Sequence, residues 1–241
     1  ATTGYTNMAN QYNFVMPSRG RPIQAFSSWI TLKKLANKLE RVNLYMYVDD
    51  DDPFIKEYKE WQETEDRTAL IVGPHIGASP AFNTLASRYI GDITFGLADD
   101  LLFRTKDWDL IFDKALETIG NKAFVIYVND PSVTHQLDTH AGVSRLWLET
   151  LGGFWSPNFK HLYADAFMKD VALRAKALYY LQDVVTEHMH PKYNKGLWDL
   201  TYFRSRNKKL KKDAEEYYNS CEAERIEWAE KLRKANDTSR N

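Results

Sequence analysis

Charged clusters follow three apolar, strand-like runs of this 241-residue chain. The loop 17–21 (Pro-Ser-Arg-Gly-Arg) follows the first run, the acids 49–52 follow the second, and Asp99-Asp100 follows the third. In an open α/β sheet, ligands sit outside the carboxyl ends of the strands, so loops that leave there share one crevice. A nucleotide diphosphate with a divalent metal suits such a mixture, because hard cations usually bridge a few carboxylates to phosphate oxygens.

The residue types in these loops fit phosphate and metal binding. Arg19 and Arg21 flank Gly20, so the backbone can approach a ligand closely while planar guanidinium groups offer paired donors to phosphate. The adjacent carboxylates of Asp99 and Asp100 disfavour each other's charge unless a cation relieves them. A divalent metal would do so.

Each acidic cluster also has a simpler interpretation. Asp99-Asp100 can be a solvated turn in which Asp100 caps a helix. The acids 49–52 can favour the positive end of the helix that follows them. Both interpretations weaken if the acids lie at the same edge of one sheet.

Three later residues are further candidates. His188 and His190 alternate in a short extended segment, which predicts that they point to opposite faces and that at most one reaches the crevice. Asp165 lies among aromatic and apolar neighbours, where partial desolvation would suit a general base. Its alternative role is to cap the helix that follows it.

The elements that must position these residues alternate between apolar runs and helical periods, which is typical of helices packed on a largely parallel sheet. Strands are expected at 13–17, 43–49, 69–73, 92–97 and 123–128. Helices are expected at 26–39, 52–61, 79–89, 107–119, 164–187 and 208–234. After Asp130-Pro131 comes a loop with His135, Asp138 and His140, of the kind that often carries binding groups.

Composition excludes several classes of protein. A formal charge of −1 gives no whole-molecule field that would attract nucleic acid or an anionic membrane. The lone Cys221 favours a reducing compartment or simple indifference to redox conditions, and we expect a cytoplasmic protein. No apolar run reaches the roughly 20 residues that span a bilayer. The chain also lacks the phosphate-loop, dinucleotide, zinc-finger and nucleophile-elbow motifs.

Read together, these motifs resemble glycosyltransferases of the GT-A fold, most closely the family 2-like enzymes often encoded by bacteriophages. The motifs are Phe14 to Pro22, Tyr47 to Pro53, Leu97-Ala-Asp-Asp100, Tyr163-Ala-Asp165 and Glu187-His-Met-His190. The resemblance implies an α/β fold with a mostly parallel central sheet, flanking helices and a C-terminal helical extension. It assigns 1–12 to a tail, 13–204 to the transferase domain and 205–241 to a charged C-terminal helix.

The resemblance also implies roles for individual residues. Ala98 stands where the family's Asp-x-Asp motif has its first acid, so Asp99 substitutes for it and Asp100 keeps the place of the last acid. The implied metal ligands are Asp100 and His188, with His190 as the other possibility, and the implied base is Asp165. The implied nucleotide-binding residues are Pro17, Ser18, Arg19, Arg21, Asp49, Asp51, Asn83 and Asp99.

The implied activity is a metal-dependent, inverting transfer of a sugar from a nucleotide-diphosphate sugar, by family analogy UDP-linked, to an acceptor hydroxyl. The implied cofactor is Mn²⁺ or Mg²⁺. The acceptor can be a modified base in phage DNA, a polysaccharide or a protein, and a phage enzyme would act in the host cytoplasm. The basic run 204–212 could meet DNA phosphates, although a solvated helix face is the alternative.

Two other functions remain open. A sugar-phosphate nucleotidyltransferase would also need acids and a metal, but usually has a Gly-rich, Lys-containing first loop; here that loop has one Gly and two Arg. A non-enzymatic binding protein would use 208–234 as a partner helix and leave the acids solvated. Nucleotide binding separates the second alternative from both enzymes, and preference for a diphosphate or a triphosphate separates the enzymes.

Overall fold

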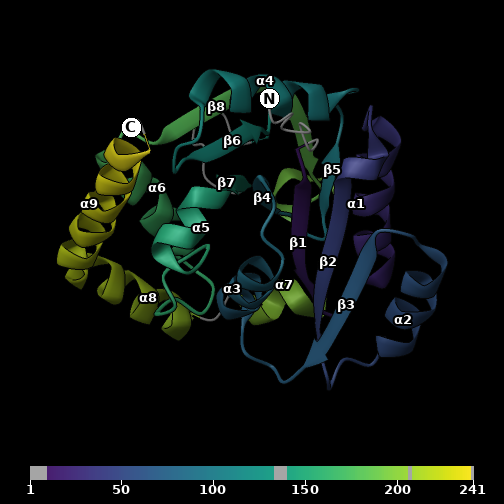
Figure 1. Ribbon diagram of the computed structural model, residues 1–241. Helices are drawn as coiled ribbons and strands as arrows, with labels where there is room; N and C mark the ends of the chain where they lie inside the picture. The colour runs from purple at the N-terminus through teal and green to yellow at the C-terminus, as the bar shows by residue number, and fades with distance from the viewer. Residues whose placement is uncertain (1–9, 133–139, 206–207, 240–241) are drawn as a thin grey trace, which may run out of the picture.

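The computed structural model describes residues 10–132, 140–205 and 208–239. An eight-stranded sheet in the order β3-β2-β1-β4-β7-β6-β8-β5 runs through its centre (Figure 1). Its strands are β1 (Tyr12–Ser18), β2 (Val42–Asp49), β3 (Thr68–Gly73), β4 (Ile93–Gly96), β5 (Leu101–Phe103), β6 (Val125–Asn129), β7 (Ala141–Ser144) and β8 (Leu178–His188). The five strands expected from the sequence are confirmed as β1, β2, β3, β4 and β6.

The strand directions bring distant loops to one edge of the sheet. Strands β1 to β4 pair in parallel. Strand β7 is antiparallel to both β4 and β6, and β8 is parallel to β6. Strands β6 and β8 therefore point the same way as β1 to β4, so their carboxyl ends share one edge with the amino end of β7.

Helices cover both faces of this sheet. They are α1 (Pro22–Leu35), α2 (Ile55–Thr64), α3 (Ala78–Arg88), α4 (Trp108–Ile119), α5 (Arg145–Leu151), α6 (Ala164–Arg174), α7 (Leu200–Ser205), α8 (Lys208–Ser220) and α9 (Glu222–Thr238), with 3-10 turns at Leu39–Arg41 and Pro191–Tyr193. Along β1, Phe14 and Met16 join a core with Trp29 and Trp108 of α1 and α4, whereas Val15 packs with Leu85 of α3. This alternation follows from the two-residue period of a strand.

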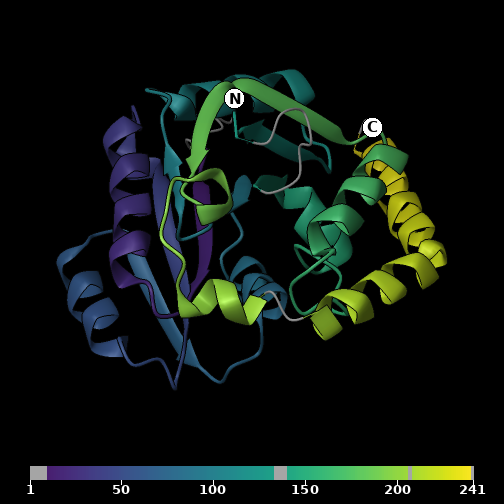
Figure 2. The ribbon, with the colours of Figure 1, turned by 180° about the vertical axis from the view of Figure 1, so that it is seen from behind.

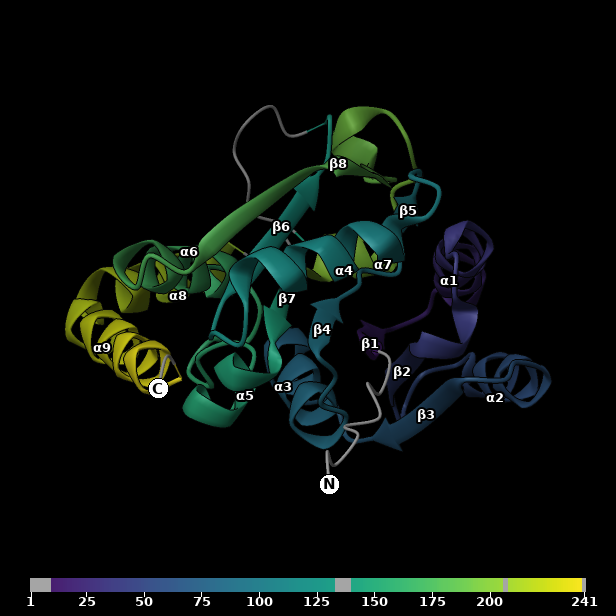
Figure 3. The same cartoon turned by 45° about the horizontal axis from the view of Figure 1, so that its top comes forward.

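The sequence prediction of a helix over 164–187 is wrong in its second half. Helix α6 ends at Arg174, and Lys176 adopts the left-handed conformation with φ of 54°. The chain then forms β8, which pairs with β6 along its first part and with β5 near its end. Figure 3 shows β8 as a long ribbon from α6 towards β5.

The C-terminal extension consists of two helices rather than the single helix expected over 208–234. The break falls at Cys221, which is buried. Helix α9 turns back against α5 and α6. There Ala229 and Leu232 join a second hydrophobic core, which includes Trp147 of α5 and Phe167 of α6. The extension therefore lies on the opposite side of the molecule from α1 and α2 (Figure 1).

No helix in the described parts of the chain combines the length and the apolar character needed to cross a membrane.

Candidate active site

Asp99 and Asp100, which follow β4, are buried. Ser18, at the end of β1, and Arg21, in the loop 19–21 that we call the first loop, hold Asp99 in place. The Ser18 hydroxyl donates to Asp99 Oδ2 at 2.8 Å, and Arg21 Nη1 donates to Asp99 Oδ1 at 3.1 Å. Arg21 Nη1 also lies 3.9 Å from Asp100 Oδ2. Burial, and then the neighbouring Asp100 carboxylate, raise the pKa of Asp99, while Arg21 and Ser18 oppose this rise. The expectation of acids at one sheet edge is thus met, and the solvated turn is wrong.

Asp100 has a different set of partners. Its Oδ2 accepts a hydrogen bond from the Tyr202 hydroxyl and lies 3.2 Å from His188 Nε2. Burial alone would raise the pKa of Asp100, but the hydrogen bonds from His188 and Tyr202 outweigh it and hold this pKa well below its ordinary value. Asp100 is therefore a buried carboxylate anion, and the Tyr202 hydroxyl and the His188 imidazole stabilise its charge.

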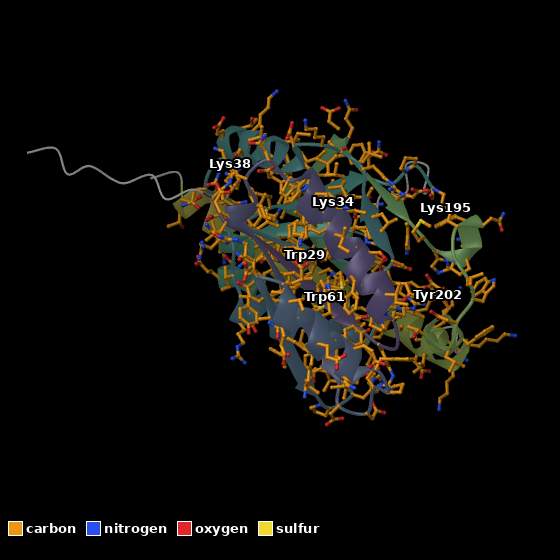
Figure 4. The ribbon with its side chains drawn as sticks, turned by 90° about the vertical axis from the view of Figure 1, so that its right-hand side faces the viewer. Trp29, Lys34, Lys38, Trp61, Lys195 and Tyr202 are labelled. Atoms are coloured by element: carbon orange, nitrogen blue, oxygen red, sulfur yellow. The ribbon has the colours of Figure 1, made fainter. Side chains whose placement is uncertain are left out.

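The segment around α7 closes over these acids. Asp199 accepts hydrogen bonds from Arg21 Nε at 2.6 Å and from Arg21 Nη2 at 2.7 Å. The Tyr202 ring lies under the same guanidinium, 3.9 Å from its carbon to the ring centroid. Thr201 Oγ1 donates to the carbonyl of Arg19 at 2.9 Å. Figure 2 shows α7 in front of the sheet, and Figure 4 places Tyr202 beside the N-terminal end of α1.

A second charged group forms at the end of β2. Arg19 Nη1 donates to Asp49 Oδ2 at 2.6 Å, and Arg19 Nη2 donates to Asp51 Oδ2 at 2.9 Å. His75 Nδ1 lies 2.7 Å from the same Asp49 oxygen. Asp49 is nearly buried, whereas the Asp51 side chain is 62% exposed. The structure thus brings together the predicted residues Arg19, Asp49 and Asp51, and it adds His75.

The helix that follows β2 supports the first loop. The Tyr58 hydroxyl of α2 lies 2.7 Å from Ser18 Oγ and accepts a hydrogen bond from the Arg21 backbone at 3.0 Å. Tyr58 is fully buried. Next to it, Trp61 stacks on Phe26 with ring centroids 4.3 Å apart, which fixes α2 against α1. These contacts hold the loop against α2.

A third group gathers around the other side of the His188 ring. Asp130 follows β6, and His140 precedes β7. The rings of His140 and His188 are nearly perpendicular, with centroids 4.9 Å apart, and His188 Nδ1 lies 3.9 Å from Asp130 Oδ2. Burial, and then the charge of His188, lower the pKa of His140 to about 3, so this imidazole is neutral at pH 7.

Other predicted residues lie in places that the sequence did not foresee. Asn83 donates to the Trp155 carbonyl at 2.8 Å and accepts from the Phe154 and Trp155 backbones at 2.8 and 2.9 Å. It therefore holds the turn before α6, and its contact with a nucleotide remains a prediction. Pro17 lies in β1, opposite Tyr47 in the register with β2.

Asp165 is the second residue of α6, and its Oδ1 accepts from the Ala166 backbone at 2.8 Å. Its role as a base remains a prediction.

His190 does not alternate with His188 as expected, because β8 ends at His188. Their rings lie 5.3 Å apart, and His190 also packs on Tyr202 at 4.4 Å. His135 and Asp138 lie outside the described residues.

Comparison of the sequence with protein-family models and with curated proteins found no match. Solved structures do match. The mannosyltransferase PcManGT from Pyrobaculum calidifontis, solved with GDP-Man and Mn²⁺, aligns with a TM-score of 0.64 over 78% of this chain at 14% identity. TarS residues 1–349 of S. aureus with UDP-GlcNAc aligns with a TM-score of 0.59 over 78% of this chain at 9% identity. The chain has the GT-A fold.

The chain spans 59% of the PcManGT chain and 62% of the TarS chain. The predicted fold class is confirmed, including the mostly parallel sheet and the helical extension.

Several residues of this site escaped the sequence analysis. One of them carried a usable signal, because Asp130 follows the apolar run 123–128 just as Asp99 follows its own run. Tyr58, Asp199 and Tyr202 gave no such signal, since their contacts depend on how α2 and α7 pack against the first loop.

Proposed function

We propose that this chain is a glycosyltransferase that moves a sugar from a nucleoside diphosphate sugar to an acceptor hydroxyl. The observation that carries the proposal is the convergence of Ser18, Arg21, Asp99, Asp100 and His188 at the carboxyl edge of a GT-A sheet. That edge is where open α/β sheets bind their ligands. The structural neighbours solved with GDP-Man and Mn²⁺ and with UDP-GlcNAc support a donor of this chemical class.

We assign the nucleotide to the edge formed by the ends of β1 and β2. Arg19, Asp49 and Asp51 already lie within hydrogen-bonding distance of one another there. Carboxylates at such a position can accept hydrogen bonds from a base or ribose, and a guanidinium offers paired donors to phosphate. By family analogy the base is uracil.

The residues Asp100 and His188 fit a divalent cation, Mn²⁺ or Mg²⁺. Two ligands bonded to one cation at about 2.1 Å lie about 3.0–3.4 Å apart. Asp100 Oδ2 and His188 Nε2 are 3.2 Å apart. A cation bound there supplies positive charge close to the departing diphosphate. Asp99 serves the donor through Ser18 and Arg21 rather than as a metal ligand.

We assign the base to Asp165 and the outcome to inversion. In a single displacement, the Asp165 carboxylate takes the proton from the acceptor hydroxyl while that oxygen forms its bond to the anomeric carbon. The bond between this carbon and the diphosphate oxygen breaks, and the diphosphate leaves with the electron pair. Because attack and departure occur on opposite faces of the sugar, the anomeric configuration inverts.

The first acceptor to test is DNA that carries hydroxylated bases, of the kind that a phage enzyme would modify. Helix α8 supports this choice, because Lys208, Lys209, Lys211 and Lys212 are exposed on it. Such a row of cations can neutralise DNA phosphates. A polysaccharide and a protein that present free hydroxyls are the two competing acceptors for the same assay.

Calorimetric titration with a panel of nucleoside diphosphates, with and without Mn²⁺, tests the donor site. We expect one diphosphate to bind, more tightly with Mn²⁺, and Asp100→Ala to remove the dependence on the metal. An unchanged metal dependence in Asp100→Ala would refute the ligand assignment. A preference for triphosphates would favour a nucleotidyltransferase, and no binding across the panel would favour a non-enzymatic role.

Asp165→Asn tests the base. We expect this variant to lose sugar transfer while it binds the diphosphate as tightly as the wild type, because Asp165 contacts the acceptor and not the nucleotide. The control is Glu149→Gln, at an exposed acid of α5. Residual transfer in Asp165→Asn that equals that of Glu149→Gln would assign the base elsewhere.

A further inference from the structure

Three buried ligand atoms converge on one side of His188 without a hydrogen-bond partner in the described parts of the chain. They are Asp130 Oδ2, His140 Nε2 and His188 Nδ1. One ligand atom from each of these residues lies within 4.8 Å of the other two. The side chains of Asp130 and His188 are only 5% and 12% exposed, and His140 is 6% exposed. Buried polar atoms are rarely left unsatisfied, so three in one place call for an occupant.

The protonation of His188 fits a positively charged occupant. His188 Nε2 faces the Asp100 carboxylate at 3.2 Å, and in the tautomer that carries the proton on Nε2 this nitrogen donates to Asp100. The Nδ1 atom then carries a lone pair directed towards Asp130. A histidine that binds a metal usually donates its other ring N–H to a carboxylate in this way. Asp130 and His188 Nδ1 are both acceptors, and a cation between them would satisfy both.

The sheet brings the three residues together. Asp130 follows the last residue of β6, His140 precedes the first residue of β7, and His188 is the last residue of β8. These strands are paired with one another, β7 to β6 and β6 to β8. At Gly142 a Cβ atom would lie 2.9 Å from Ile93 and Phe95 side chains, so β7 sits close against its neighbours. The three ligands therefore lie at one edge of the sheet.

We propose that Asp130, His140 and His188 form a binding site for a divalent transition metal, distinct from the cation site assigned to the sugar donor. Two imidazole nitrogens and one carboxylate suit Zn²⁺ and similar cations, whereas Mg²⁺ and Ca²⁺ prefer oxygen ligands. Three protein ligands leave a fourth position for water or another ligand. The site goes beyond the proposed glycosyl transfer and does not require it.

The two cation sites share His188. A neutral imidazole has one lone pair, so it binds one cation at a time. A metal at Asp130 and His140 keeps the ring proton on Nε2, and Asp100 then accepts a hydrogen bond where it would otherwise share a cation with His188. We call the group of Asp130, His140 and His188 the histidine site. Zn²⁺ bound there should therefore weaken the Mn²⁺-dependent part of diphosphate binding.

Zinc calorimetry on metal-free protein, without any nucleotide, tests the proposal. The wild type should bind Zn²⁺ at one tight site, and Co²⁺ should give the visible absorption bands of a tetrahedral complex. His140→Ala removes a ligand, so its affinity should fall by more than the about 10- to 100-fold that loss of an outer-shell partner costs. Asp130→Asn nearly preserves side-chain volume and should also weaken Zn²⁺ binding, which covers the case in which His140→Ala does not fold.

His75→Ala is the matched control, because His75 is exposed and pairs with Asp49 at the end of β2. It should bind Zn²⁺ as the wild type does. Absence of tight Zn²⁺ binding in the wild type, or equal affinity in Asp130→Asn and the wild type, would overturn the site and leave ordered water as the occupant.

The two proposals fail separately. Diphosphate binding without tight Zn²⁺ binding would keep the transferase and remove the histidine site. Zn²⁺ binding that depends on Asp130 and His140, without binding of any nucleotide, would keep the site and remove the transferase.

Discussion

The two sides of the His188 ring differ in how completely their polar groups are satisfied. On the Nε2 side, Asp99 and Asp100 receive hydrogen bonds from Ser18, Arg21 and Tyr202. On the Nδ1 side, three ligand atoms lack a hydrogen-bond partner among the described residues. The Nε2 side, called the saturated side below, is held together by hydrogen bonds of the protein itself, so a cation on Asp100 would displace the hydrogen bond from His188. On the Nδ1 side, a cation would displace no hydrogen bond of the described residues. The comparison teaches that unused hydrogen-bonding capacity indicates a ligand site separately from the burial of an acid.

Removal of Arg21 should have the largest effect on the saturated side. Arg21→Ala leaves Asp99 and Asp199 without their guanidinium partner, and loss of one member of a buried ion pair costs about 3–5 kcal/mol. Urea unfolding measures this loss. Lys56→Ala is the control, because its pair with Glu60 is exposed and is worth about 0.3–0.5 kcal/mol. Equal losses in the two variants would mean that the buried charges find other partners.

The two buried acids on opposite sides of His188 should respond differently to neutralisation. Asp100→Asn loses charge-assisted hydrogen bonds from Tyr202 and His188, so its free energy of unfolding in EDTA should fall by about 1.5–3 kcal/mol. Asp130→Asn removes a buried charge whose Oδ2 has no hydrogen-bond partner among the described residues, and it can keep the bond that Oδ1 accepts from the Ser132 backbone, so it should change that free energy by less than about 1 kcal/mol, in either direction. A larger loss in Asp130→Asn than in Asp100→Asn would reverse the comparison.

Removal of the Tyr202 hydroxyl isolates one bond of the saturated side. Tyr202→Phe keeps the ring against Arg21 but removes a donor to Asp100, which should cost about 1–2 kcal/mol in thermal or urea unfolding. Tyr180→Phe, at a position 43% exposed, should stay within about 0.5 kcal/mol of the wild type. The same small change in both variants would show that His188 alone satisfies Asp100.

The smallest effect on stability is expected at the exposed end of the β2 cluster. Asp51→Asn disrupts an ion pair whose acid is 62% exposed, and such pairs contribute about 0–1 kcal/mol. Calorimetry on the same variant should show weaker binding of the nucleoside diphosphate, because Asp51 is assigned to the nucleotide. Unchanged affinity would remove Asp51 from the nucleotide site without affecting the assignment of Asp49.

The sequence was sufficient to predict the parallel half of the fold. Asp49 and Asp99 follow largely apolar runs, and parallel strands carry such residues to one edge whatever the exact pairing. Strand β8 was not predictable in the same way. The break between α6 and β8 falls at Lys176, which adopts a left-handed conformation that usually marks Gly or Asn.

The histidine site shows a second limit of prediction from sequence. His140 reaches Asp130 only because β7 returns antiparallel beside β6, so the amino end of one strand meets the carboxyl end of the other. Periodicity does not reveal which strands pair. The contacts of α7 cannot be predicted from the sequence for the same reason, since Asp199 and Arg21 are separated by 178 positions along the chain.

The long distance along the chain between Arg21 and Asp199 has a consequence for folding during synthesis. Strands β1 to β4 can assemble as soon as they leave the ribosome, but β5 pairs with β8 alone among the described strands and must wait for it. Until residues 188 to 202 emerge, the carboxylate of Asp100 has neither His188 nor Tyr202, and Arg21 has no Asp199. Contacts of such high order form slowly. Nascent chains stalled before α7 should therefore keep an open, protease-sensitive edge, and ligand competence should appear only after residue 202 has emerged.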